Sequence, residues 1–144
     1  MQAFLLQDSE LDFMLNCTFK ITWSNRIGYQ SDNIDGIPAS GGVYEIQGRK
    51  TTDGGYTRRY IGMSENLRQI YSKHLSDDES NEKLKKFLRE KKAFFRYVTS
   101  DREQTRKDLQ KGLYYKHKHS FNNGDVLPSG SGKYLEIKIE ETNP

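Results

Sequence analysis

The sequence predicts a small mixed α/β sandwich in which a central antiparallel three-stranded sheet is flanked by helices, with additions at both ends. Two β-type tripeptides, Gly42-Val43-Tyr44 and Tyr60-Ile61-Gly62, are separated by a connector that holds the turn signal Asp53-Gly54-Gly55. Apolar residues then recur at helical spacing directly after the second tripeptide. The length of 144 residues favours one domain, residues 1–144.

The remaining elements follow from the same two kinds of pattern. Stretches rich in β-branched and aromatic residues are expected to be strands, or in the first case a strand or helix–strand element: Leu11–Met14 with Phe19, Ile21 and Trp23, then Gly42–Ile46, Arg58–Met63, Ala93–Val98 and Tyr134–Ile139. Stretches with helical spacing run from Ser64 through His74, over Asn81–Lys91, and from about Ser100 to Lys116.

Polar residues mark the ends of these elements. Ser64 is expected to be the N-cap of the first helix, and Ser100 with Glu103 forms a capping box before the third. Asn25–Ser40 is polar and contains Gly and Pro, so we expect a long surface loop there.

Composition narrows the class of protein without giving a function. The 23 Lys and Arg barely exceed the 20 Asp and Glu, so a nucleic-acid signal must come from clusters such as Lys83–Lys92 and Tyr114–His119. Cys17 is the only cysteine, which excludes an internal disulfide framework and suits a reducing compartment. Because no apolar run is long enough for a membrane span and residues 1–10 lack signal-peptide features, we expect a soluble cytoplasmic protein without a membrane partner, with the nucleus left open.

The two tripeptides and the helix after them resemble a known family. Gly42-Val43-Tyr44, Tyr60-Ile61-Gly62 and a helix that carries His74 are similar to the core of the GIY-YIG nuclease superfamily, which includes excision-repair and homing endonucleases. Asp108–Asn123 resembles the third helix of that family and the asparagine-containing turn after it. The similarity covers about residues 37–123 and implies a GIY-YIG-like fold for them.

The resemblance also implies roles in phosphodiester cleavage. Tyr44 would activate or orient the attacking water, Tyr60 would line the same pocket, and His74 would contact phosphate or water. In the family, a helix arginine stabilises the phosphate under attack, and a glutamate binds one divalent metal ion. The residues at these two positions are here Ile70, eight residues after the glycine of the second tripeptide, and Gln110.

Loss of both charged groups bears directly on activity. A phosphodiester gains negative charge during cleavage, so a fixed cation or a metal ion must face it. Ile70 offers neither charge nor donor, and the Gln110 amide lacks the charge that holds a single-carboxylate metal site. Arg68 lies about 200° away from Ile70 around a helix, so we expect it to point away from the site. We therefore interpret the chain as a pseudoenzyme without a cofactor, which would need Mg²⁺ or Mn²⁺ only if it were active.

Under this interpretation the domain binds nucleic acid, with DNA as the first candidate. It would bind through the cleft that holds phosphate in the family and through a basic rim around that cleft. The expected rim residues are Arg58, Arg59, Arg68, Lys73, Lys116 and Lys118. Two alternatives stay open: an active metal-dependent DNA endonuclease with a rearranged catalytic set, and a protein-binding domain without a nucleic-acid role. Without the resemblance, Tyr44 and Tyr60 are better explained as ordinary sheet aromatics, and His74 as a solvated or packed helix residue.

Overall fold

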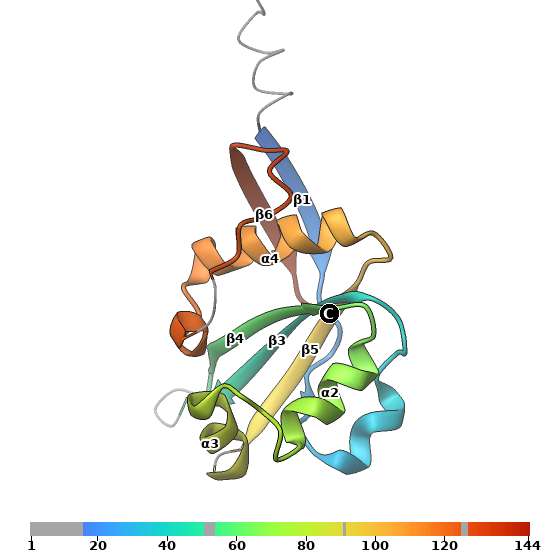
Figure 1. The fold of residues 1–144 in the computed structure, drawn as a ribbon, viewed down its shortest axis with the longest axis vertical. Coiled ribbons are helices and arrows are strands. Elements are labelled where there is room, and N and C mark those ends of the chain that lie inside the picture. The colour runs from blue at the N-terminus through green and yellow to red at the C-terminus, as the bar shows by residue number, and fades with distance from the viewer. Residues whose placement is uncertain (1–15, 51–53, 91, 125–126) are drawn as a thin grey trace, which may run out of the picture.

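The computed structural model describes residues 16–50, 54–90, 92–124 and 127–144, and it has a mixed α/β fold with two sheets (Figure 1). The larger sheet has the strand order β2-β5-β3-β4, and neighbouring strands run antiparallel. Its strands are β2 Ile27–Gly28, β3 Gly42–Arg49, β4 Tyr56–Ser64 and β5 Ala93–Thr99. The predicted sheet of three strands is therefore extended by the two-residue β2, which the sequence did not indicate.

Strand β3 lies between β4 and β5, and both of its faces contribute to a core. Successive side chains of a strand point to opposite faces. Tyr44 and Ile46 join the core on one side, which includes residues of α2 (Leu67–Leu75) and α3 (Glu82–Glu90). Val43 joins the core on the other side, which includes residues of α4 (Glu103–His117). The sheet thus has α2 and α3 on one side and α4 on the other (Figure 1).

The helix starts differ from those predicted by the capping signals. Helix α2 begins after Asn66, whose side-chain oxygen accepts a backbone N–H of the first turn at 3.0 Å. Ser64 is instead the last residue of β4, and its hydroxyl accepts the N–H of Asn66 at 3.0 Å. Helix α4 starts after Arg102, which makes no side-chain cap bond. The predicted capping box of Ser100 and Glu103 is therefore wrong.

The predicted surface loop Asn25–Ser40 contains regular structure and a buried anchor. Besides β2 it holds the 3-10 helix η1, Ser31–Gly36. Tyr29, between these two elements, is buried and stacks on Tyr71 with ring centroids 4.3 Å apart. Its hydroxyl also donates to the Tyr71 carbonyl at 2.9 Å. The loop prediction was wrong here because one aromatic residue ties the segment to α2.

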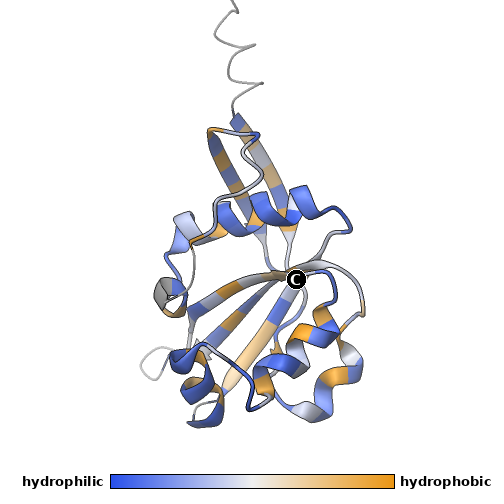
Figure 2. Ribbon diagram, viewed as in Figure 1, coloured by the Kyte–Doolittle hydropathy of each residue, from blue (hydrophilic) through white to orange (hydrophobic). Residues whose placement is uncertain are grey.

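The smaller sheet joins strands from both ends of the described chain. Strands β1 (Asn16–Thr22) and β6 (Glu136–Thr142) pair in parallel and project beyond α4 (Figure 1). Apolar and polar residues alternate along both strands (Figure 2). The apolar side packs on α4, where a Cβ atom at Gly112 would lie 2.8 Å from Ile139. The predicted strand Tyr134–Ile139 is thus shifted towards the C-terminus and pairs with β1.

Some expectations fall at the margins of the described residues. Leu11–Met14 and Asp53 of the turn signal lie outside them. Gly54, next to that aspartate, has φ +72°, a left-handed conformation that glycine adopts without steric cost. The 3-10 helix η2, Ser120–Gly124, follows α4. Within the described ranges, no helix combines the length and the apolar character needed to cross a membrane.

Candidate functional site

Tyr44 and Tyr60 lie on neighbouring antiparallel strands, as predicted. Tyr44 of β3 is paired with Gly62 of β4, and Tyr60 is paired with Ile46. The two rings face the α2 side with their centroids 6.2 Å apart. A side chain at Gly62 would collide with the ring and the hydroxyl of Tyr44. The glycine of the second tripeptide therefore makes room for the tyrosine of the first.

A buried chain of hydrogen bonds begins at the Tyr44 hydroxyl. This hydroxyl lies 2.6 Å from Nε2 of His74, while Nδ1 of His74 is in direct contact with Oε2 of Glu79. Tyr44, His74 and Glu79 are only 2%, 5% and 7% exposed. A proton on Nδ1 satisfies both contacts, because Nδ1–H then donates to the carboxylate and Nε2 accepts the phenol proton. Helix α2 therefore presents His74 to Tyr44.

Burial and pairing fix the protonation state at both ends of this chain. Removal from water, with a smaller contribution from neighbouring Tyr60, raises the pKa of Tyr44 well above its ordinary value. Burial alone would raise the pKa of Glu79, but the hydrogen bonds from His74 and from the Asn81 backbone lower it. The site thus holds a neutral phenol and a carboxylate joined by an imidazole. A phenol in this state donates hydrogen bonds and is a poor base at neutral pH.

An open hollow of about 520 Å³ lies along the outer side of α2 and the end of β4. Its lining residues are Ser64, Gln69, Ile70, Ser72, Lys73, Ser76 and Asp78. Ile70 also packs against the core that contains Tyr44, so an apolar side chain connects the hollow to the buried chain. Arg68 does not supply a cation here, because its Nε donates to the Ile37 carbonyl at 2.7 Å. The prediction that Arg68 points away is confirmed.

Gln110 and Asn122 bind the free edge of β4 and do not line the hollow. The Asn122 amide accepts the N–H of Ile61 and donates to its carbonyl, each at 2.9 Å. Nε2 of Gln110 lies 3.5 Å from the same carbonyl. No group of three or more His, Cys, Asp or Glu in the described ranges could hold a metal ion. With an amide turned to the backbone in place of a carboxylate, the donor set does not fit the metal that the resemblance implies.

The predicted basic rim is spread over different parts of the molecule. Lys73 lines the hollow, whereas Arg59 lies over Phe87 and Phe121, with its Cζ atom 5.8 and 5.5 Å from their ring centroids. Arg58 and Lys116 form ion pairs on the opposite side of the sheet, and Lys118 lies over exposed Tyr115. The expectation that all six cations surround one cleft is therefore wrong, because β3 and β4 separate them.

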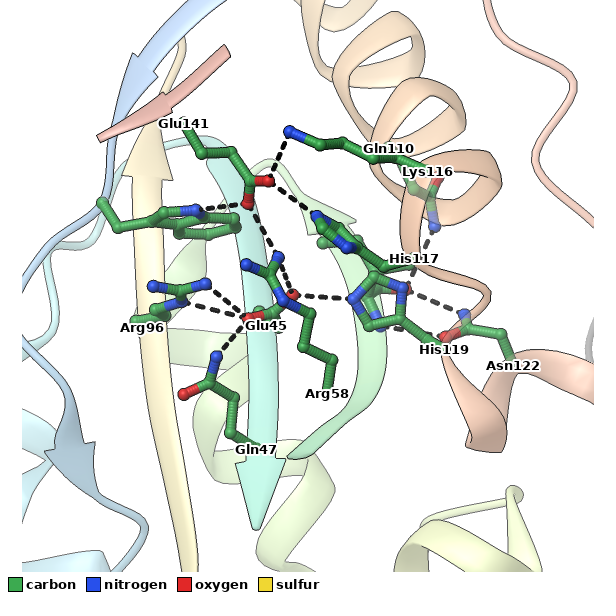
Figure 3. Close-up of polar contacts among 12 residues, drawn as sticks. Glu45, Gln47, Arg58, Arg96, Gln110, Lys116, His117, His119, Asn122 and Glu141 are labelled. Atoms are coloured by element: carbon green, nitrogen blue, oxygen red, sulfur yellow. Dashed lines mark hydrogen bonds and ion pairs between the residues drawn. The ribbon is translucent and has the colours of Figure 1, made fainter. Parts of the chain in front are cut away.

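Two carboxylates organise the α4 side of the sheet (Figure 3). Glu45 of β3 is fully buried and accepts from Arg96 at 3.0 Å, from Arg58 at 3.1 Å and from His119 at 2.7 Å. Arg58 also reaches Glu141 of β6 at 2.7 Å. The other donors to Glu141 are Trp23, Lys116 and His117. Arg58 thus bridges the two carboxylates and ties the smaller sheet to the larger one.

The donors of the network keep both of its carboxylates ionised. Burial would raise the pKa of Glu45 and of Glu141, but hydrogen bonds from histidine and the nearby arginine lower both. Burial lowers the pKa of His119, whose Nδ1 is buried without a hydrogen-bond partner among the described residues. His119 is therefore held neutral while it donates to Glu45.

Sequence reasoning missed both Glu79 and this network. Asp77, Asp78 and Glu79 follow α2 in succession, and only packing decides which of them reaches His74. The signal for the network was present: Glu45 is the one carboxylate of β3, and Arg96 is the one charged residue of β5. Opposite charges in two buried strands are expected to pair, because an unpaired charge there is very costly.

Comparisons with known proteins add no relative. A scan against models of known protein families finds no match, and a search of curated proteins finds no similar sequence. The resemblance to GIY-YIG nucleases therefore rests on the sequence alone: the two tripeptides, the position of His74 and the segment Asp108–Asn123.

Proposed function

We propose that this chain is a GIY-YIG-like domain that binds DNA and lacks conventional metal-dependent cleavage. One observation carries the proposal: Ile70 lines the hollow and packs against the core that contains Tyr44, whose hydroxyl contacts His74. The resemblance requires a phosphate-stabilising arginine at this position. The carboxylate for the metal is missing as well, because position 110 is a glutamine. Its amide is directed to the β4 edge.

The arrangement of the elements supports assigning the finer fold to this superfamily. In this assignment β5, β3 and β4 form the three-stranded core, with α2, α3 and α4 around it. The two tyrosines stand on β3 and β4, and His74 faces them from α2. Strand β2 and the β1–β6 sheet are then additions to the core.

The chemistry of the hollow suits contact with a phosphate backbone. Lys73 supplies a positive charge, and the Gln69 amide with the hydroxyls of Ser64, Ser72 and Ser76 supplies neutral donors. Such groups make most protein contacts to phosphate and sugar, and they carry no sequence information. Asp78 at the rim limits the net charge, so binding through the hollow alone is expected to be weak.

The intact Glu79–His74–Tyr44 chain favours one alternative, an active endonuclease with a rearranged catalytic set. A tyrosine oriented by an imidazole and a carboxylate could position a water molecule even without the arginine. Cleavage of DNA that depends on Tyr44 would support this alternative over the binding domain.

We expect the purified chain to bind duplex DNA weakly and with little sequence preference. Non-specific binding of this electrostatic kind gives dissociation constants of about 10⁻⁴ to 10⁻⁶ M at physiological salt. Fluorescence anisotropy of a labelled duplex, titrated at several salt concentrations, measures both the affinity and its salt dependence. The variant Lys73→Gln should make the slope of log K against log salt shallower by about 0.9, the loss of one phosphate contact.

The matched control is Lys83→Gln, which removes an exposed lysine of α3 that does not line the hollow. It should leave the slope close to that of wild type. Absence of DNA binding even at low salt would contradict the proposal and favour a protein-binding domain.

A further inference from the structure

We infer that a second surface, at the hairpin end of the sheet, binds the phosphate backbone of DNA. This surface, the hairpin-end patch, consists of Arg26, Arg49, Tyr56, Lys92 and Phe94. The inference rests on the proposed DNA-binding role, but it moves the main contact away from the hollow to the other side of the sheet.

The β-strand alternation places the patch opposite the Tyr44 site. Arg49 has the same parity on β3 as Glu45, which forms the network on the α4 side. Phe94 has the same parity on β5 as Arg96, which pairs with Glu45. Tyr56 faces Arg49 across the β3–β4 pair. Three strands thus contribute to one end of this face.

Aromatic rings hold the cations of the patch in place. The guanidinium carbon of Arg26 lies 4.0 Å from the centroid of the Tyr56 ring, and that of Arg49 lies 5.6 Å from both Tyr56 and Phe94. Nζ of Lys92 lies 5.9 Å from the Phe94 ring. The two rings meet edge to face with centroids 5.3 Å apart. Cations stacked on rings keep their N–H groups free for another acceptor.

In the part of the chain that the structure describes, neighbouring carboxylates do not neutralise the charge of the patch. Among the described residues, no Asp or Glu oxygen lies within 4.0 Å of the charged nitrogens of Arg26, Arg49 or Lys92. The side chain of Arg26 donates instead to the neutral Gln47 amide at 2.6 Å. Arg58 and Arg96, farther along the same face, are by contrast bound to Glu45. Arg49 and Lys92 are exposed.

This combination suits a polyanion with regularly spaced charges. Arginine presents a planar fork that matches phosphate oxygens, and the rings reduce its freedom before binding. Each phosphate that a cation neutralises on duplex DNA contributes about −0.9 to the salt slope. Three contacts from the patch would contribute about −2.7, more than the single lysine of the hollow.

The test compares two triple variants of the full chain by anisotropy with a short labelled duplex, between about 50 and 200 mM salt. One carries Arg26→Gln, Arg49→Gln and Lys92→Gln. The control carries Lys20→Gln, Arg89→Gln and Lys107→Gln, which removes the same charge from exposed ion pairs elsewhere. We expect the patch variant to bind on the order of 10²-fold more weakly with a shallower slope, and the control to bind within about threefold of wild type.

Equal weakening by the two triple variants would overturn the inference. The inference would also be overturned if Lys73→Gln lost DNA binding while the patch variant bound DNA as tightly as wild type. The proposed function would stand in that case. Failure of wild type to bind DNA at low salt would overturn both.

Lysine acetylation, read by mass spectrometry on wild-type protein, gives an answer even where a triple variant does not fold. Lys92 should be protected when DNA is added, and Lys20 should not. Equal labelling of Lys92 with and without DNA would contradict the inference.

Discussion

Replacing Glu45 with glutamine will lower the free energy of unfolding by about 3–5 kcal/mol. Glu45 is fully buried and is the shared acceptor for Arg96, Arg58 and His119. Without its charge, the guanidinium of Arg96, itself 1% exposed, has no anionic partner in the described residues. A buried charge that loses its partner keeps the full cost of leaving water. Urea unfolding at neutral pH, followed by circular dichroism, measures the change.

The control for this prediction is Glu140→Gln on β6. Glu140 forms an exposed ion pair with Lys20, at 3.9 Å. Exposed pairs of this kind contribute about 0.2–1 kcal/mol, so this variant should unfold close to wild type. Similar small losses for the two variants would show that Glu45 does not hold the network together.

The variant Ile70→Arg will bind duplex DNA more tightly, by about fivefold to tenfold near 0.1 M salt. Ile70 lines the open hollow, so a longer side chain there can extend into it beside Lys73. An added phosphate contact should also make the salt slope steeper by about 0.9. Anisotropy with the same labelled duplex measures both quantities.

Thr18→Arg is the matched control, because it adds the same charge at an exposed position of β1, away from the hollow. A comparable gain in the two variants would mean that general attraction, and not the hollow, explains the effect.

Adding Gln110→Glu to Ile70→Arg should restore cleavage only in part at best. The side chain at position 110 is directed to the Ile61 carbonyl and not into the hollow.

The parts of the fold that the sequence predicted have local signals. The turn between two β-type tripeptides places Tyr44 beside Gly62, and helical spacing carries His74 to the same face. Both outcomes depend on alternation and on helix geometry over a few residues. Helix ends were less predictable, because Ser64 and Asn66 are both good caps and the end of β4 decides between them.

The parts that the sequence did not predict depend on contacts between distant segments. His119 reaches Glu45 across 74 positions, and Arg58 reaches Glu141 across 83. No periodicity specifies such pairs, although charges inside apolar strands indicate that partners must exist. Gln110 was placed by family position alone, and the rotation of α4 that turns its amide to the β4 edge is set by packing. The basic rim failed because strand alternation would put Arg58 on the same face as Tyr60, whereas a register shift between Ile46 and Gln47 turns Arg58 to the face of Glu45.

Under the proposed function, this domain binds DNA without cutting it in the conventional, metal-dependent way. Electrophoresis of supercoiled plasmid with the purified wild-type chain in Mg²⁺ or Mn²⁺ and low salt tests it most directly. Loss of a preorganised charge costs on the order of 10²- to 10³-fold in such reactions, and here two charged groups are absent. We predict that the protein retards the plasmid and that the DNA, once stripped of protein, remains supercoiled. Conversion to nicked or linear DNA by wild type, abolished in Tyr44→Phe, would contradict the account.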